Sequence, residues 1–225
     1  MAERSHLLLI RPKVQSEAFL ADCEARLGHQ IDAVISPIID IRPLGGIPDL
    51  DGFGTVVFSS ANGVRQVSDK LAGRNVVTVG DATAKVARSF NADAAAFGET
   101  ANDLLDRASE LVPPVLVCRG VHARVDLASE LQDRGITTDS AVIYDQVAQP
   151  LTADAVDLLN GTVPVVIPLF SPRSAALLSK QRCSAPLKVI AISDAVKSAW
   201  SGEPVAKIAK APTSMAVRDL VTVAL

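Results

Sequence analysis

Two short stretches of small, hydroxyl-bearing residues each end an apolar run and precede a helical pattern. The first is FSSAN at 58–62 and the second is FSPRS at 170–174. Free N–H groups at a helix start, together with serine hydroxyls, suit an anion such as a carboxylate. The same residues also cap helices when no ligand is present. The two stretches therefore predict either carboxylate-binding turns or plain helix caps.

Other polar side chains lie near the ends of further apolar runs and extend this candidate anion site. The alternatives are a salt bridge at the sheet edge for the arginines, a solvated side chain for the lysine and capping for the hydroxyl residues. The candidate substrate-binding residues are Arg11, Ser59, Ser60, Asn62, Thr83, Arg119, Ser171, Ser174, Lys188 and Ser193.

The overall charge of the chain restricts its ligands. Its 225 residues include 22 Lys and Arg against 25 Asp and Glu, which gives a formal net charge of −3. A strongly basic surface is therefore not expected, and we predict no nucleic-acid partner. An anionic ligand would have to be held by local groups rather than by the field of the whole protein.

Cysteine and histidine usage argues against a metal site or a disulfide framework. The three cysteines are isolated, and none of the three histidines has ligand spacing with them. P-loop and G-x-G-x-x-G patterns are absent, so we expect no metal, nucleotide or redox cofactor. The apolar run at 7–10 is too short for a signal peptide, and no run reaches membrane-spanning length. We predict a soluble, cytoplasmic protein with no membrane partner.

The elements that would position these residues alternate along the chain. Short β-branched runs separated by helical patterns are typical of parallel sheets covered on both faces, which predicts an α/β fold. The expected strands are 6–10, 33–36, 55–59, 76–79, 115–118, 140–147, 165–170 and 188–192. The expected helices are 15–28, 61–72, 82–90, 101–111, 123–134, 152–160, 173–181, 194–201 and 213–224. The segment 37–54, rich in Pro, Gly and Asp, is predicted to be a connection, and 149–153 a weaker boundary.

Local signals support several of the helices. Apolar residues predicted to share one face of the first helix are Phe19, Cys23, Ala25 and Leu27. Glycines predicted to end helices, and threonines predicted to cap them, are Gly28, Gly135, Thr100 and Thr213.

One half of the chain repeats the other. The matched segments are LLLIRP (7–12) with VLVCRG (115–120), the two hydroxyl-rich stretches, VTVGDATAKVARSF (77–90) with IAISDAVKSAW (190–200), and GETANDLLDRA (98–108) with APTSMAVRDLV (211–221). The offset stays between 108 and 113 residues throughout. Several matched pairs in one order at a nearly constant offset predict two similar α/β lobes that arose by internal duplication.

With these segments in order, the chain resembles the uroporphyrinogen-III synthase family over essentially its whole length. The motifs that support the resemblance are LIRP (9–12), VVFSSANGV (56–64), VTVGDATA (77–84), VLVCRG (115–120), AVIYDQV (141–147), LFSPRSA (169–175), VIAISDA (189–195) and APTSMAV (211–217). The resemblance implies two Rossmann-like lobes joined by a two-stranded linker, with the active site in the cleft between them. One lobe would comprise 1–36 and 148–225, the other 39–145, with linker strands near 36–38 and 144–147.

The resemblance also implies an activity. Such an enzyme closes linear hydroxymethylbilane, which carries eight carboxylates, into uroporphyrinogen III with inversion of ring D and loss of water. No metal or redox cofactor is implied. The family suggests a monomer that contacts the preceding enzyme of the pathway transiently. Tyr144, the single tyrosine, falls on a proposed linker strand and is the candidate catalytic residue. Its ordinary alternative is a buried tyrosine whose hydroxyl bonds to the backbone.

The chain departs from the family pattern in the second-half turn. The family usually has I-G-x-T-T-A, whereas residues 192–197 read ISDAVK, and Arg173 stands where a small residue is usual. Two alternatives therefore stay open: a degenerate paralogue with a regulatory role, and a two-lobed protein that binds a small polyanion without chemistry.

Overall fold

The computed structural model describes residues 5–46, 48–123, 125–204 and 206–225. The chain forms two compact units. Unit 1 comprises Met1–Asp40 and Val147–Leu225, and unit 2 comprises Ile41–Gln146. Residues 1–4, within the first predicted lobe, and residue 124, within a predicted helix, lie outside the described residues.

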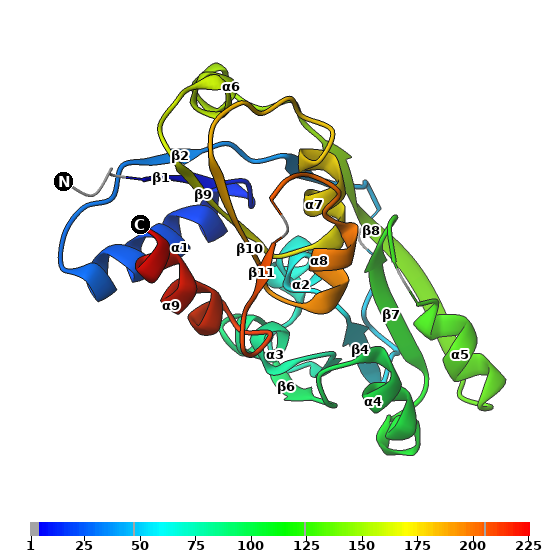
Figure 1. Cartoon of the computed structure of the whole chain (residues 1–225). Helices are drawn as coiled ribbons and strands as arrows, with labels where there is room; N and C mark the ends of the chain where they lie inside the picture. Colours follow the sequence, from blue (N-terminus) through cyan, green and yellow to red (C-terminus); the bar gives the residue numbers. More distant parts are fainter. Residues whose placement is uncertain (1–4, 47, 124, 205) are drawn as a thin grey trace. The chain divides into compact units, whose positions relative to one another are not determined.

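Unit 1 is built around a five-stranded sheet in the order β11-β10-β9-β1-β2, whose neighbouring strands in the described residues pair in parallel. Helices α1 and α9 pack together, and α7 packs with α8 (Figure 1). The strands are β1 (His6–Leu9), β2 (Ala33–Ile35), β9 (Val165–Leu169), β10 (Leu187–Ala191) and β11 (Lys207–Ile208). The helices are α1 (Lys13–Leu27), α6 (Ala153–Asn160), α7 (Pro172–Leu178), α8 (Asp194–Ala199) and α9 (Ser214–Ala224).

Unit 2 is built around a six-stranded sheet in the order β3-β8-β7-β4-β5-β6. Its strands are β3 (Ile39–Pro43), β4 (Thr55–Phe58), β5 (Asn75–Thr78), β6 (Asp93–Ala96), β7 (Val115–Gly120) and β8 (Thr138–Ala148). Its helices are α2 (Ala61–Gln66), α3 (Asp81–Arg88), α4 (Ala101–Asp106) and α5 (Leu127–Asp133), with short 3-10 turns at Ser68–Lys70 and Ala108–Glu110.

The two sheets share one plan. The order β11-β10-β9-β1-β2 corresponds strand for strand to β6-β5-β4-β7-β8. The pairs β1/β7 and β10/β5 overlap matched sequence segments, and β9 and β4 lead into the two matched hydroxyl-rich stretches. The halves differ in chain order, because β1 begins unit 1 whereas its counterpart β7 follows β6. The α/β fold with duplicated parallel sheets is thus as the sequence predicts.

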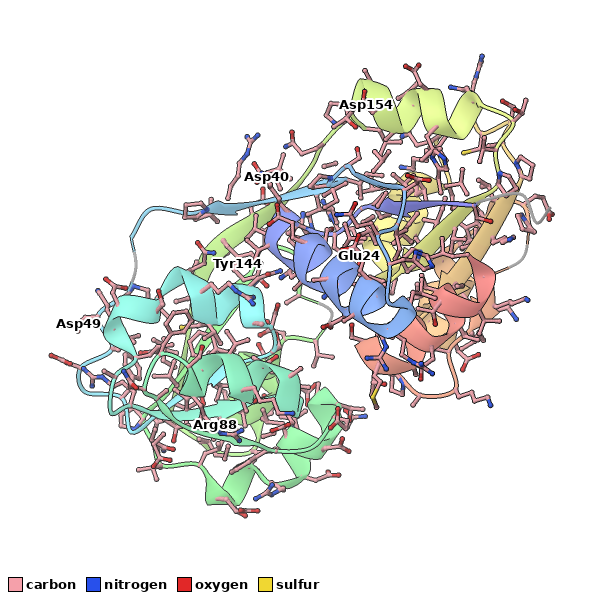
Figure 2. All side chains as sticks on the ribbon, turned by 90° about the vertical axis from the view of Figure 1, so that its left-hand side faces the viewer. Glu24, Asp40, Asp49, Arg88, Tyr144 and Asp154 are labelled. Carbon is pink, nitrogen blue, oxygen red and sulfur yellow. The ribbon has the colours of Figure 1, made fainter. Side chains whose placement is uncertain are left out.

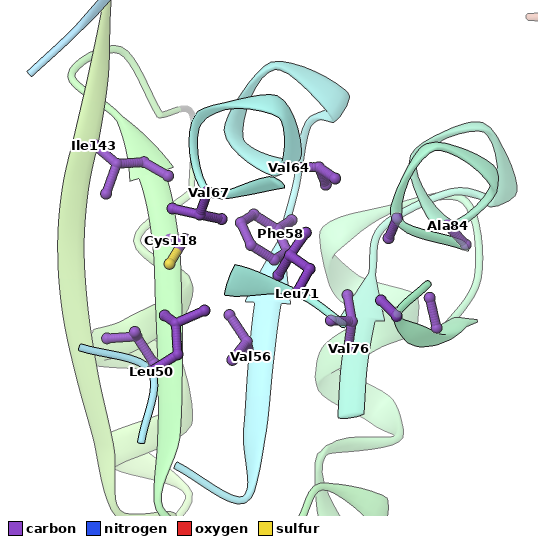
Figure 3. Close-up of a cluster of buried hydrophobic side chains, with 14 of the residues drawn as sticks. Leu50, Val56, Phe58, Val64, Val67, Leu71, Val76, Ala84, Cys118 and Ile143 are labelled. Atoms are coloured by element: carbon purple, nitrogen blue, oxygen red, sulfur yellow. The ribbon is translucent and has the colours of Figure 1, made fainter. Parts of the chain in front are cut away.

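The core explains why the central strands are apolar without alternation. Val56 and Phe58 of β4 join a buried cluster with Leu71 under α2 (Figure 3). Val57, between them in sequence, belongs to a second cluster on the other face, with Leu104 of α4. Because both faces of the strand are covered, every residue of β4 is buried. Unit 1 has a matching core around Leu9, Phe19 and Val217.

Strand β3 lies inside the segment predicted to be a connection. Ile38 O accepts a hydrogen bond from Gln149 N at 2.9 Å, and Leu44 N donates to Ile143 O at 3.0 Å. The partner's number falls as the residue number rises, so this segment runs antiparallel to β8. The prediction of an irregular connection is wrong for 39–43, where IDIR alternates apolar and polar residues. The chain passes between the units on β3 and β8.

Most local predictions are confirmed. Gly28 (φ 77°) and Gly135 (φ 78°) adopt the left-handed conformation that follows a helix. Thr100 accepts from Asp103 N, and Thr213 accepts from Ala216 N, both at 3.2 Å.

Three local predictions fail for identifiable reasons. Ala25 is exposed, because only Ser16, Phe19 and Cys23 of α1 are buried, and residue 25 lies off their face. The sequence did not predict strands β6 (DAAA) and β11 (KI), because neither contains a run of β-branched residues long enough to indicate a strand.

No helix of the described ranges is both long and apolar enough to span a bilayer.

Candidate functional site

Each sheet contains one point where the chain connections lead away in opposite directions. In unit 1 this point lies between β1 and β9, and in unit 2 between β7 and β4. In open α/β sheets, ligands bind beyond the carboxyl ends of the strands at such a switch point. We call the residues that follow β1, β9 and β10 the unit 1 edge. Those at the ends of β4, β5, β7 and β8 form the unit 2 edge.

The unit 1 edge holds a fixed cation beside hydroxyl groups. The Arg11 guanidinium lies 4.1 Å from the ring centroid of Phe170, which itself meets Phe19 edge-on with centroids 5.2 Å apart. Ser171 Oγ accepts from Ser174 N at 3.1 Å and donates to Ser174 Oγ at 2.8 Å. Ser171 therefore caps α7, which is the helix-cap alternative predicted from the sequence. It follows Phe170, whose ring contacts the Arg11 guanidinium.

Ser193 occupies the second-half turn and does not reproduce the first-half turn. Its counterpart Gly80 has φ 79°, a conformation that favours glycine, whereas Ser193 has an extended backbone with φ −157°. The missing glycine is thus accommodated by a different backbone path. Ser193 makes no side-chain cap hydrogen bond to α8. Asp194 beside it is exposed.

In the first-half turn, the acidic residue has an ordinary role. Asp81 forms ion pairs with Lys85 at 2.9 Å and with Arg88 at 3.4 Å. The hydrogen bond from Lys85 is the main cause of its lowered pKa. Thr83, in the first turn of α3, is only 7% exposed and is therefore mostly buried.

At the unit 2 edge, the two serines of the first hydroxyl-rich stretch differ in their surroundings. Ser60 Oγ accepts from Asn62 N at 3.2 Å, so Ser60 caps α2. Ser59, one residue earlier, is exposed. Asn62 also accepts, through its backbone oxygen, a bond from Gln66 Nε2 at 3.3 Å. Capping and ligand binding are compatible here, because a hydroxyl that accepts through its oxygen retains its proton for donation.

Tyr144 lies on β8 behind this stretch (Figure 2). The β7–β8 register shifts between the pairs Arg119–Val142 and Gly120–Tyr144, which leaves Ile143 as an extra residue in β8. Such a bulge re-aims the following side chain. As a result both Ile143 and Tyr144 are buried in the unit 2 core, at 1% and 5% exposure.

Two glycines lie beside the Tyr144 ring, and one of them makes room for it. A Cβ on Gly120 would lie 2.6 Å from Tyr144 Cζ, and one on Gly63 would lie 3.6 Å from Tyr144 Cε1. A Cβ at 2.6 Å cannot be accommodated, so the absence of a side chain at position 120 is what admits the ring. Position 63 leaves ordinary contact distance to the tyrosine. Neither glycine was singled out by sequence reasoning, although RG at 119–120 interrupts a buried strand and is a usable signal.

Burial raises the pKa of the Tyr144 phenol, and its hydrogen bond with the Ser60 hydroxyl only partly opposes this effect. The phenol is therefore neutral at physiological pH and a weaker acid than tyrosine in water. Tyr144 is therefore buried, as the ordinary alternative predicts. Its hydroxyl, however, is hydrogen-bonded to the Ser60 side chain rather than to the backbone.

Two basic residues predicted to bind the ligand, Arg119 and Lys188, hydrogen-bond to other groups of the protein. Arg119 donates through Nε to Ser140 Oγ at 3.2 Å and through Nη1 to Gly120 O at 3.3 Å, which directs it across β8. Lys188 is the second residue of β10 and pairs in register with Val166, at the opposite end of the sheet from the unit 1 edge. Its Nζ donates to Ala224 O at 2.7 Å and to Ser5 Oγ at 2.9 Å.

One pair at the unit 2 edge was not found from the sequence. His122 Nε2 lies 3.4 Å from Asp145 Oδ1. The two residues are separated by 23 positions, and only the pairing of β7 with β8 brings them together. Within the described residues, no group of three His, Cys, Asp or Glu side chains is arranged to hold a metal ion.

Comparisons with known proteins give the family of the chain and the relatives of its fold. The family model for uroporphyrinogen-III synthase HemD matches residues 23–217. The structure is similar to that of uroporphyrinogen-III synthetase from Helicobacter pylori 26695, with 16% identity, a TM-score of 0.68, and coverage of 98% of this chain and 100% of that one. It is also similar to a mutant uroporphyrinogen III synthase from the extremely thermophilic bacterium Thermus thermophilus, with 15% identity, a TM-score of 0.52, and coverage of 96% and 97%. These two likenesses concern the fold. Curated protein sequences yield no significant match.

Proposed function

This chain belongs to the uroporphyrinogen-III synthase family of tetrapyrrole biosynthesis, and on that premise we propose how its two edges serve the conversion of hydroxymethylbilane to uroporphyrinogen III. The observation that carries the assignment is the family match over 23–217, which spans both units. The enzyme is a hydro-lyase that closes the ring with loss of water. The two compact units are proposed to be the two lobes of the enzyme, with β3 and β8 as the linker.

Carboxylate binding is assigned to both edges. The substrate carries eight negative charges and the chain a formal net charge of −3, so the attraction must come from local groups. At the unit 1 edge, Arg11 offers a guanidinium whose position is fixed by Phe170. At the unit 2 edge, Ser59 and Ser60 offer hydroxyls beside the N–H groups of α2.

The chemistry begins with departure of the hydroxymethyl oxygen. The C–O bond breaks as the electron pair of the adjacent pyrrole nitrogen is delocalised toward the hydroxymethyl carbon, which forms the exocyclic double bond. The oxygen is protonated and leaves as water. The resulting azafulvene is attacked by the substituted carbon of ring D, and fragmentation of the spiro intermediate followed by reclosure inverts that ring. Loss of a proton restores aromaticity. Because the uninverted isomer forms without enzyme, holding the chain ends in the productive shape is a major part of catalysis.

Tyr144 is assigned a role of orientation in this scheme. Its ring is wedged against Gly120 and its hydroxyl is bonded to Ser60, which itself caps α2. The phenol thus links the end of β8 to the hydroxyl stretch after β4. A neutral, buried phenol donates a hydrogen bond well but gives up its proton poorly.

We further propose that the enzyme works as a monomer in the cytoplasm. The isolated cysteines fit a reducing compartment. A transient contact with the enzyme that produces hydroxymethylbilane would shorten the time in which this substrate closes spontaneously to the wrong isomer.

One assay tests the function. Purified protein is supplied with hydroxymethylbilane, and the porphyrinogen isomers are oxidised and separated by chromatography. The expected product is type III in excess of the enzyme-free control. Type I alone, at the rate of the control, would leave the binding protein or the degenerate paralogue as the better description.

A further inference from the structure

The His122–Asp145 pair stands at the carboxyl end of β7, two residues beyond the glycine that admits Tyr144. The imidazole Nε2 and the carboxylate Oδ1 are 3.4 Å apart, and the side chains are 43% and 30% exposed. Val121, immediately before the histidine, donates its N–H to Tyr144 O at 3.0 Å. The pair is therefore tied by backbone to the tyrosine while remaining open to a ligand.

Asp145 is supported from the other side by β3. Counting two residues from the Leu44–Ile143 hydrogen bond places Arg42 opposite Asp145, and the same register continues to Ile38–Gln149. Directly opposed residues of an antiparallel pair share a face of the sheet. Asp145 Oδ1 also accepts from Gln146 N at 2.6 Å. The register thus places Arg42 on the same face of the sheet as Asp145, whose carboxylate contacts the imidazole that follows β7.

The remaining charged groups near the pair have other partners. Arg119 of β7 is directed to Ser140 and Gly120. Asp126, which precedes α5, accepts from Ser129 N at 3.3 Å. Asp40, on the same strand as Arg42, stands opposite Val147 in the β3–β8 register. Asp145 is therefore the carboxylate that faces His122 within the described residues.

The reaction needs a proton donor that the rest of the unit 2 edge does not supply. Tyr144 is buried and bonded to Ser60, and the serine hydroxyls are not acids at physiological pH. The other histidines belong to unit 1: His6 begins β1, and His29 follows α1, where its Nδ1 lies 2.8 Å from Gln30 O. Histidine is the side chain best suited to give and regain a proton near neutral pH.

We propose that His122 is the general acid of the reaction, an inference that rests on the proposed function. The imidazolium transfers its proton to the departing hydroxymethyl oxygen as the C–O bond breaks, and the oxygen leaves as water. The pyrrole nitrogen supplies the electron pair, so no oxidant or reductant takes part. The proton lost when ring D regains aromaticity returns to the neutral imidazole. Asp145 is a positioning residue that orients the imidazole through the 3.4 Å contact between Oδ1 and Nε2.

The test compares His122→Gln with His29→Gln in the full-length protein. General acid catalysis contributes about 10²- to 10⁴-fold, so His122→Gln is expected to lower kcat by about 100-fold while KM changes little. The matched control at the exposed His29 is expected to keep wild-type kinetics. In His122→Ala, added imidazole should restore part of kcat, which a purely structural role would not allow.

Asp145→Asn provides a second measurement. Without the carboxylate the imidazole is no longer held in one orientation, so Asp145→Asn should lower kcat several-fold with KM close to wild type. Wild-type kcat in His122→Gln, or no rescue of His122→Ala by imidazole together with wild-type kcat in Asp145→Asn, would overturn the proposal. A wild-type enzyme that makes only type I isomer would instead refute the underlying function, so the two failures are distinguishable.

Discussion

The two carboxyl edges share a scaffold and differ in the chemistry they carry. Both lie beyond a central pair of parallel strands flanked by helices, in the same strand order. The unit 1 edge presents Arg11 over an aromatic ring and a pair of serines. The unit 2 edge presents a wedged tyrosine and a histidine–carboxylate pair. Duplication accounts for the shared architecture, and from the difference we propose that unit 1 mainly binds while unit 2 mainly carries the chemistry.

The lengths of two matched strands explain much of this difference. β2 has three residues, whereas its counterpart β8 has eleven and contains the bulge at Ile143. The extra length continues β8 beyond the end of β7 and lets Tyr144 and Asp145 stand at the edge. A strand that ends at Ile35 offers no such platform in unit 1.

The largest expected effect on stability comes from filling the tyrosine's space. Gly120→Val should destabilise the protein by about 3 kcal/mol, because overpacking beside Tyr144 forces the ring or backbone to move. The counterpart in unit 1 is Pro12, where Pro12→Val should cost less than about 1 kcal/mol. Urea unfolding measures both. Equal costs at the two positions would show that the edges are packed alike.

Alkaline pH should weaken the unit 2 core. Burial raises the pKa of the Cys118 thiol to about 12 from 9.0. The unfolded chain therefore loses this proton first, so stability falls as pH rises above 9. The contribution lost between pH 9 and 11 is about 2 to 3 kcal/mol. Cys118→Ala should flatten that slope in unfolding experiments.

Unit 1 also contains a buried thiol, on helix α1 rather than on a strand. Cys23 has its pKa raised to about 12, mainly by burial, while Arg218 opposes the shift. Cys23→Ala should flatten the same slope. A slope unchanged in both variants would mean that neither thiol titrates later in the folded protein than in the unfolded chain.

Arg11 is expected to matter for binding more than for stability. Arg11→Gln removes a cation–π contact worth about 0.5 to 1 kcal/mol. It also removes a charge-assisted bond to a carboxylate, worth about 1.5 kcal/mol, which corresponds to a roughly tenfold rise in KM. Phe170→Leu keeps the charge but loses its support, so a smaller rise is expected. Unchanged KM in both variants would remove Arg11 from the site.

Matched helix caps give the smallest contrast. Thr100 caps α4 as part of a reciprocal box, in which Asp103 Oδ2 accepts from both Glu99 N and Thr100 N at 2.8 Å. Thr213 caps α9 through a single bond. Thr100→Ala should cost about 1 kcal/mol and Thr213→Ala about half as much. The reverse order in thermal unfolding would show that the box contributes nothing.

Much of the fold could be predicted because its signals are local and repeated. Continuous apolar runs such as 55–58 reflect strands covered on both faces, and the duplication doubled every signal. Glycines that end helices, such as Gly28, were visible for the same reason. Strand β3 was missed because flanking Pro and Gly residues hid its short alternation.

The site was less predictable because its geometry depends on pairing across strands. The approach of His122 to Asp145 depends on β7 lying beside β8, and the burial of Tyr144 depends on one extra residue in the register. Neither leaves a spacing signal in the sequence. Lys188 illustrates the converse: its place beside an apolar run suggested a role in binding, but it lies at the opposite end of β10 from Ser193.

The comparison of the edges is tested most directly by steady-state kinetics of Arg11→Gln and Tyr144→Phe with hydroxymethylbilane as substrate. We expect Arg11→Gln to raise KM with kcat close to wild type, and Tyr144→Phe to lower kcat several-fold with KM close to wild type and no loss of folded structure. The opposite pattern, with kcat sensitive to Arg11 and KM alone sensitive to Tyr144, would contradict the assignment of binding to unit 1 and chemistry to unit 2.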